Sequence, residues 1–87
     1  MKLSTKTRYG VRALVDLACQ SGQGHISLSS IAQRQDLSPK YLEQEFATLR
    51  RAGILKSVKG AQGGYMLARP PSEIRVDEVI RVLEGDL

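Results

Sequence analysis

Residues 38–44, SPKYLEQ, place a hydroxyl, an ammonium, a phenol, a carboxylate and a carboxamide within about two helical turns. Groups of this kind can recognise base edges: Gln44 can pair with adenine N6 and N7, Glu43 can accept from cytosine N4, and Lys40 can reach guanine or phosphate. The candidate base-reading set is Ser38, Lys40, Tyr41, Glu43 and Gln44. The alternative is that these are ordinary polar residues on a solvated helix face.

A second candidate segment is KGAQGGY, residues 59–65, which holds three glycines and one lysine. It lacks the lysine and hydroxyl that follow the glycines of a nucleotide-binding loop, so such a site is not expected. The flanking runs ILKSVK and YMLA are rich in β-type residues and predict a two-stranded hairpin with this segment at its tip. We expect the glycines to supply positive φ and close approach to a nucleic-acid backbone, or else only to form the turn. The candidate contact residues are Lys59, Gln62, Gly63 and Gly64.

The sequence offers little for catalysis or metal binding. His25 is the only histidine and Cys19 the only cysteine, so the chain alone cannot complete a structural zinc site or hold an iron–sulfur cluster. His25 lies among serines that suit helix capping, and a loop role is favoured over a hydrolytic one. Cys19 is expected to pack against the core, with a redox or ligand role as the alternative. We therefore expect no enzyme activity, no metal site and no cofactor in this chain.

The charge of the chain is unevenly distributed. The net charge is +4 over 87 residues, but residues 1–69 hold 11 Lys and Arg against 4 Asp and Glu, whereas residues 70–87 hold 2 against 5. A basic region of this kind indicates a polyanionic partner. No apolar run approaches the ~18 residues of a membrane span, no secretory signal is present, and a single cysteine fits a reducing compartment. We expect a cytoplasmic protein with no membrane association.

Periodicity and capping signals predict four helices around the hairpin. Helices are expected over about residues 6–21 and 39–52, with a short helix of about two turns after Ser27 and a final helix before Gly85. Ser38 as N-cap and Pro39 at the first helical position give the third helix a clear start. The predicted fold is mainly α with a small β-hairpin, in the order helix, helix, helix, strand, strand, helix. This is a winged helix-turn-helix, expected as a single domain over residues 1–87.

The third predicted helix has two distinct faces. At roughly 100° per residue, three apolar side chains fall within about 40° of one another and define the buried side; they are Leu42, Phe46 and Leu49. The opposite side is polar, basic and small, with Lys40, Gln44, Ala47 and Arg51. A helix used for protein assembly would tend to expose apolar or aromatic anchors there instead.

Three parts of the sequence resemble the Rrf-two family of bacterial winged helix-turn-helix transcription regulators, the group of IscR-, CymR- and NsrR-like proteins. They are the opening LSTKTRYGVRAL, the pattern YLEQ followed by LRxAGxxxSxxGxxGGY, and the closing DEVIRVLEG. The resemblance covers nearly the whole chain, and the combination is specific.

The resemblance implies a homodimeric, sequence-specific regulator, expected to act as a repressor, that binds a palindromic operator in double-stranded DNA. The YLEQ helix would enter the major groove, and the glycine-rich wing would lie against the neighbouring minor groove or backbone. With Arg51 from the exposed face, the expected backbone contacts are Lys6, Arg8, Tyr9 and Arg51. The alternative is a winged-helix protein-interaction module that does not bind DNA.

The sequence departs from the family pattern at its end. Relatives continue past the LEG motif into a long dimerisation helix, and several carry three clustered cysteines that hold an iron–sulfur cluster, whereas this sequence stops at Leu87. We therefore expect these residues to correspond to the DNA-binding portion, without cluster binding or an effector response.

Overall fold

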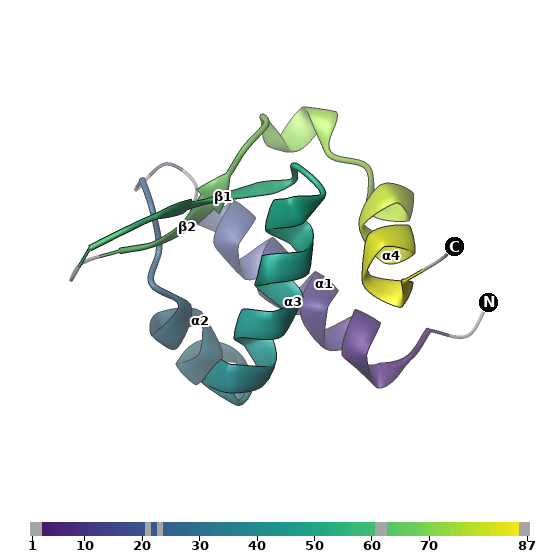
Figure 1. Ribbon diagram of the computed structural model, residues 1–87, viewed down its shortest axis with the longest axis horizontal. Helices are drawn as coiled ribbons and strands as arrows, with labels where there is room; N and C mark the ends of the chain where they lie inside the picture. The colour runs from purple at the N-terminus through teal and green to yellow at the C-terminus, as the bar shows by residue number, and fades with distance from the viewer. Residues whose placement is uncertain (1–2, 21, 23, 61–62, 86–87) are drawn as a thin grey trace.

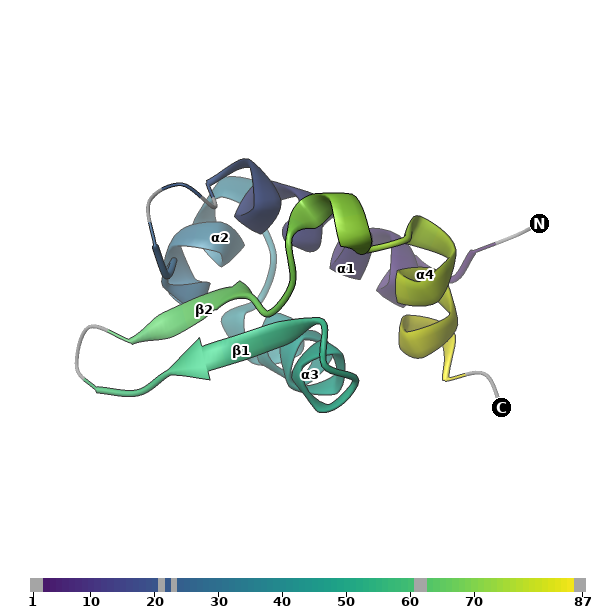
Figure 2. The ribbon, with the colours of Figure 1, turned by 90° about the horizontal axis from the view of Figure 1, so that it is seen from above.

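The computed structural model describes residues 3–20, 22, 24–60 and 63–85. Its elements, in chain order, are α1 (Thr5–Cys19), α2 (Leu28–Gln35), α3 (Pro39–Arg51), β1 (Leu55–Val58), β2 (Gly64–Leu67), a 3-10 helix η2 (Pro71–Glu73) and α4 (Val76–Glu84). The predicted fold class, mainly α with a small hairpin in winged helix-turn-helix order, is confirmed. In Figures 1 and 2 the hairpin strands run away from α4, which lies at the opposite end of the molecule.

Serine N-caps start the first three helices. The side chains of Ser4, Ser27 and Ser38 accept from the backbone N–H three residues later, so each satisfies a donor that the helix cannot pair internally. The helix ends are less regular. The first helix ends at Cys19, earlier than expected, because the Gln20 N–H bonds to the Leu17 carbonyl at 3.0 Å in a tight final turn.

The turn between α2 and α3 depends on a residue in the left-handed conformation. Asp36 caps α2 with φ 56° and ψ 49°, and its backbone N–H bonds to carbonyls of the last turn. Glycine or asparagine is the usual residue at such a position, so an aspartate here is not a strong signal for a helix end. The cap lets the chain reverse direction within a few residues and begin α3 at Pro39.

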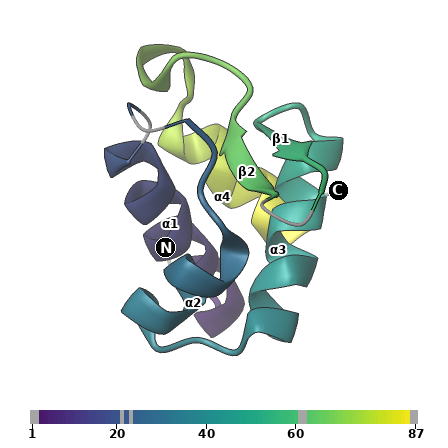
Figure 3. The ribbon, with the colours of Figure 1, turned by 90° about the vertical axis from the view of Figure 1, so that its left-hand side faces the viewer.

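The buried stripe of α3 lies at the centre of the core. Leu42, Phe46 and Leu49 are completely inaccessible to solvent, as the helical spacing predicts. In Figure 3, α1 and α3 lie on opposite sides of the molecule, with α2 in front of them and α4 behind. These helices and the start of β1 supply the rest of the core: Ala13, Leu14, Leu17, Ile31, Ala32, Ile54, Leu55, Val79 and Leu83. Thr7 and Glu45 are also buried, which the sequence did not predict.

The hairpin is joined to the helices by a third segment of extended chain. β1 and β2 pair antiparallel, with Ser57 opposite Tyr65. Tyr65 also exchanges two backbone hydrogen bonds of 2.8 Å with Ile26, in the connection between α1 and α2. The Tyr65 ring packs edge-on against Phe46, with 5.2 Å between the ring centroids. Through Tyr65, near the start of β2, the hairpin is therefore attached both to the α1–α2 connection and to the buried side of α3.

The glycines of the hairpin are needed for two different reasons. Gly60 adopts φ +115°, as predicted, but Gly63 and Gly64 do not have positive φ, so the prediction is wrong for them. A Cβ on Gly63 would lie 2.2 Å from the Val58 carbonyl oxygen, and one on Gly64 would lie 2.3 Å from the Ile26 oxygen. These two glycines permit close approach between backbones.

Replacing Gly64 by Ala should destabilise the fold, because the new Cβ would meet the rigid backbone of Ile26. We expect a loss of about 1–3 kcal/mol in the free energy of unfolding, measured by urea denaturation. Gly22→Ala is the matched control, since a Cβ there meets nothing within 4 Å and the effect of the added methyl on the unfolded chain is similar. Equal stability of the two variants would show that close approach between the backbones of Gly64 and Ile26 does not require a glycine.

Candidate nucleic-acid interface

The polar residues at the start of α3 face solvent. Ser38, Lys40, Glu43 and Gln44 are exposed, whereas Tyr41 is half-buried. This distribution follows from the buried stripe, which turns the opposite side of the helix outward. No large apolar side chain is exposed on α3; within the described residues, the exposed large hydrophobics are Val15 and Val76.

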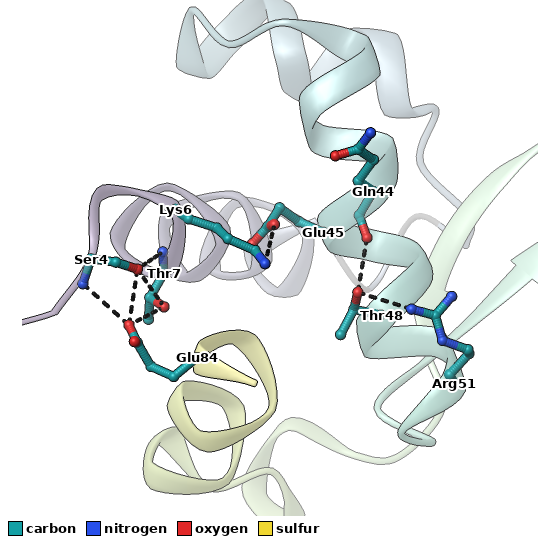
Figure 4. A network of polar contacts seen from close by, with 8 residues as sticks. All are labelled: Ser4, Lys6, Thr7, Gln44, Glu45, Thr48, Arg51 and Glu84. Carbon is teal, nitrogen blue, oxygen red and sulfur yellow. Dashed lines mark hydrogen bonds and ion pairs between the residues drawn. The ribbon is translucent and has the colours of Figure 1, made fainter. Parts of the chain in front are cut away.

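Hydrogen bonds along α3 organise the C-terminal half of the same face. The Thr48 hydroxyl donates to the Gln44 carbonyl at 3.1 Å, and Arg51 Nη2 donates to Thr48 Oγ1 at 3.2 Å (Figure 4). The Arg51 guanidinium is thus drawn back along the helix toward Thr48 (Figure 4). The result is a connected polar strip from Gln44 to Arg51.

The start of α1 lies against the start of α3. Tyr9 and Tyr41 meet edge to face, with ring centroids 6.4 Å apart, and the Arg12 guanidinium carbon lies 5.3 Å from the Tyr9 ring centroid. Burial, the Glu45 charge and the Tyr9 ring together raise the pKa of Tyr41. Two sets of candidate residues that are distant in sequence are therefore neighbours in the fold.

Arg12 is a candidate that the sequence analysis did not select. It follows Tyr9 by three residues, a spacing that places both side chains on one helix face, so this signal was available. Arg12 Nη2 donates to Gln35 Oε1 at 3.4 Å. It lines a shallow hollow between α1 and the α2–α3 turn, together with Thr5, Tyr9, Gln35, Asp36, Leu37, Ser38 and Tyr41.

The supporting helix α2 is fixed to α1 by an ion pair. Arg34 donates to both carboxylate oxygens of Asp16, with its shortest contact 2.6 Å from Nη2 to Oδ1, and Gln35 Nε2 donates to Asp16 Oδ2 at 2.9 Å. These donors, the Arg34 hydrogen bond foremost, lower the pKa of Asp16. This arginine therefore serves the fold and is not free to contact a ligand.

The first turn of α1 is tied to α4 through Glu84. The Ser4 backbone N–H and hydroxyl donate to Glu84 Oε2 at 3.1 and 2.9 Å, and the Thr7 hydroxyl donates to the same oxygen (Figure 4). These hydrogen bonds, that of Thr7 foremost, lower the pKa of Glu84. The glutamate of the closing LEG segment thus anchors the helix turn that carries Lys6 and Arg8, a role that the sequence alone did not indicate.

The remaining candidates lie at the edges of this surface. Lys6 and Arg8 are exposed on the first turns of α1, and Lys6 Nζ lies 3.9 Å from Glu45 Oε2. Lys59 is exposed where β1 leads into the hairpin tip, and Gly63 and Gly64 are half-buried. Gln62 lies outside the described residues.

An apolar groove occupies a different side of the molecule. Val15 is 55% exposed on α1 and Val76 is 64% exposed at the start of α4. Both border a groove that is also lined by Val11, Leu14, Ala18, Leu67, Pro71, Ile74 and Val79. The exposed apolar surface of the described residues therefore lies on α1 and α4 rather than on the outer face of α3.

Two further expectations from the sequence are that Cys19 packs in the core and that no helix spans a membrane. Cys19 is exposed at the end of α1, so the expectation that it packs in the core is wrong. Among the described helices, none combines the length and the apolar character that crossing a membrane requires.

The chain is similar to a defined set of transcriptional regulators. Residues 3–87 match the family model Rrf2, described as an iron-dependent transcriptional regulator. The HTH-type transcriptional regulator CymR of Bacillus subtilis is 51% identical over 87 residues, which is all of this chain and 63% of that protein. The HTH-type transcriptional regulator IscR of Cereibacter sphaeroides is 54% identical over 86 residues, 97% of this chain and 56% of that protein.

Solved structures that are similar to this chain also include regulators named IscR and CymR. IscR of T. potens superposes with a TM-score of 0.89 at 61% identity, covering all of this chain and 64% of that chain. CymR (YrzC), the global cysteine regulator of B. subtilis, superposes with a TM-score of 0.92 at 50% identity, covering 98% of this chain and 66% of that chain. This chain spans less than two thirds of each of these relatives.

The family description implies iron, and the residues can be tested for a site. In the portion of the chain that the structure describes, no three His, Cys, Asp or Glu side chains come together in a way that could hold a metal ion. Cys19 is the only thiol of the chain and lies alone at the end of α1. The described residues therefore supply no set of ligands for iron.

Replacing Glu84 by Gln should weaken the anchor of α1 in a pH-dependent way. The folded-state pKa of Glu84 is lowered from its ordinary value of 4.5, so the carboxylate contributes stability that is complete above pH 4.5 and is lost as the pH falls through the folded-state pKa. The difference in unfolding free energy between wild type and Glu84→Gln should therefore be larger at pH 7 than at pH 3, measured by urea denaturation.

Glu73→Gln is the matched control, because the exposed Glu73 side chain makes no hydrogen bond or ion pair with the described residues. Its stability should follow that of the wild type at both pH values. If the difference in unfolding free energy between the wild type and Glu84→Gln is the same at pH 7 and pH 3, the charge of the carboxylate does not anchor α1.

Proposed function

Since this chain belongs to the Rrf2 family of transcriptional regulators, we propose that residues 1–87 form one DNA-binding domain that recognises a palindromic operator. The protein acts as a homodimeric repressor in the bacterial cytoplasm. The observation that carries this proposal is the exposed polar face of α3, flanked on one side by the basic start of α1 and followed in the chain by the wing. A helix presented in this way suits the major groove of duplex DNA.

The proposal divides the contacts into two kinds. The N-terminal residues of α3 read base edges, as recognition helices generally do, because they reach deepest into the groove; they are Ser38, Lys40, Tyr41, Glu43 and Gln44. Phosphate contacts fix the register of the helix on the duplex without reading sequence. These come from Lys6, Arg8, Tyr9 and Arg51, with the wing residues Lys59, Gln62, Gly63 and Gly64 at the neighbouring groove.

The contact between Tyr9 and Tyr41 gives this division a mechanical basis. Tyr9 belongs to the backbone-gripping end of α1, and Tyr41 to the base-reading turn of α3, and their rings touch edge to face. A phosphate bound by α1 therefore sets the position of α3 in the groove through a packed aromatic contact. Arg12, stacked beside Tyr9, adds positive charge to the same edge.

The rival function is a protein-interaction module. It would favour apolar anchors on the outer face of α3, where Lys40, Gln44 and Arg51 are exposed instead. The apolar groove bordered by Val15 and Val76 suits self-association, which a reader of palindromic sites needs in addition to its recognition helix. The proposal assigns no cofactor to these residues.

Selection of duplexes from a random pool at physiological salt tests the proposal most simply. We expect enrichment of a single motif with inverted-repeat symmetry, and an affinity that falls as salt rises, because bound phosphates release counterions. Enrichment of no motif, together with an affinity that does not depend on salt, would favour the interaction module.

Two substitutions should separate the two kinds of contact. Gln44→Ala should cost about 1–3 kcal/mol on the selected duplex and little on a random one, because it removes a base contact. Lys59→Ala should weaken both duplexes similarly and reduce the slope of log affinity against log salt by about one unit. Arg81→Ala, which removes one exposed positive charge from α4, is the matched control and should leave both affinities nearly unchanged. Loss of binding to the selected duplex alone in Lys59→Ala would contradict the division of roles.

A further inference from the structure

Glu45 is a carboxylate on the buried side of the proposed recognition helix. It is only 2% exposed and lies between the apolar residues Leu42, Phe46 and Leu49 on the same face of α3. An ionised carboxylate in such a position is costly unless it is paired and hydrogen-bonded. Base reading by the exposed face of α3 does not use this residue, so its presence needs a separate explanation.

The two oxygens of Glu45 have different surroundings. Oε1 is buried and has no hydrogen-bond partner among the described residues. It lies against α1, since a Cβ on Gly10 would be 3.1 Å from Oε1, and this same Cβ would be 2.7 Å from Leu83 Cδ1 of α4. Oε2 lies 3.9 Å from Lys6 Nζ, and within the described part of the chain this carboxylate makes no other ion pair (Figure 4).

We propose that Glu45 is a positioning residue that holds Lys6 in the free protein and takes up one proton when Lys6 moves to a DNA phosphate. This inference rests on the proposed function, because it requires a phosphate at Lys6. The Lys6 side chain is 55% exposed and reaches from the solvent surface to a buried oxygen, so its ammonium group is shared between the interior and the surface that the phosphate approaches.

The coupling follows from charge balance at Glu45. When Lys6 turns to a phosphate, the buried carboxylate loses its counter-ion and gains a second negative charge nearby. Both changes disfavour the ionised form of a group that burial already disfavours. Uptake of a proton from solvent removes the unpaired charge and gives the carboxyl a donor of its own.

The other groups around Glu45 support this direction. Burial raises the pKa of Glu45 in the free protein, and the Lys6 charge opposes that rise. On α3 itself, Tyr41 precedes Glu45 by four residues, and burial, followed by electrostatic interaction with Glu45 and with Tyr9 of α1, raises the pKa of this phenol. From α4, Leu83 is apolar, and Glu84 is held by Ser4 and Thr7. Among the described residues, Lys6 is thus the only cation that pairs with Glu45.

The inference can be tested by measuring the affinity for a duplex of random sequence as a function of pH. A random sequence is sufficient because the proton uptake requires only a phosphate at Lys6. As the pH rises, the affinity of the wild type should fall, because binding takes up a proton. The fall should be up to about tenfold per pH unit between the pKa of Glu45 in the free protein and its higher pKa in the complex. The lower limit of this interval lies above 4.5, because burial raises the pKa from that value. Glu45→Gln, which keeps the size of the side chain, should lose this part of the dependence.

Glu73→Gln is the matched control and should keep the wild-type pH profile, since the Glu73 side chain is exposed on η2 and makes no hydrogen bond or ion pair with the described residues. A pH profile of Glu45→Gln that matches the wild type, with binding otherwise intact, would overturn the inference alone. Absence of binding to any duplex at any pH would overturn both the inference and the proposed function.

If Glu45→Gln does not fold, the inference can be tested on the unmodified chain. The side-chain carboxyl carbon of Glu45 can be titrated by ¹³C NMR in the free protein and in the complex with the same duplex. We expect its titration midpoint to move to higher pH on binding. An unchanged midpoint would overturn the inference.

Discussion

The complete burial of Leu42, Phe46 and Leu49 is the constraint on which the proposed interface depends. Removing one such side chain typically costs about 2–5 kcal/mol, so α3 cannot rotate about its axis without a large loss of stability. A shift of one residue would turn the helix by roughly 100° and carry Gln44 away from the exposed side. The same packing that stabilises the fold therefore determines which chemistry the molecule presents.

This constraint extends to both neighbours of α3. Near the middle of the helix, the absence of a side chain on Gly10 lets α1, Leu83 of α4 and Glu45 of α3 approach closely. The next residue, Phe46, packs against Tyr65 of the hairpin. The two outer parts of the proposed interface, the start of α1 and the wing, are therefore positioned by contacts with the buried side of the helix whose other side is exposed.

The fold and the exposed face of α3 could be predicted because they depend on local signals: serine caps, Pro39, and apolar residues at helical spacing. The contacts that cross between elements could not. Glu45 carries an ionisable carboxyl and would be expected in solvent, but it is buried and its ion pair is with Lys6 from another helix. The backbone bridge between Ile26 and Tyr65 explains Gly64, which the sequence indicated as a turn former or a DNA-contact residue but not as a site of close approach within the protein. The family resemblance supplied candidate phosphate contacts, but not their packing against Tyr41.

The central claim is that the exposed face of α3 meets DNA. Transfer of NMR saturation from the protons of a bound duplex to the amides of the perdeuterated chain measures this contact directly. The account predicts that the strongest losses of signal occur at Lys40, Gln44 and Lys59, with little effect at Val15 and Val76. Losses confined to the apolar groove around Val15 and Val76, with the α3 amides unchanged, would contradict it.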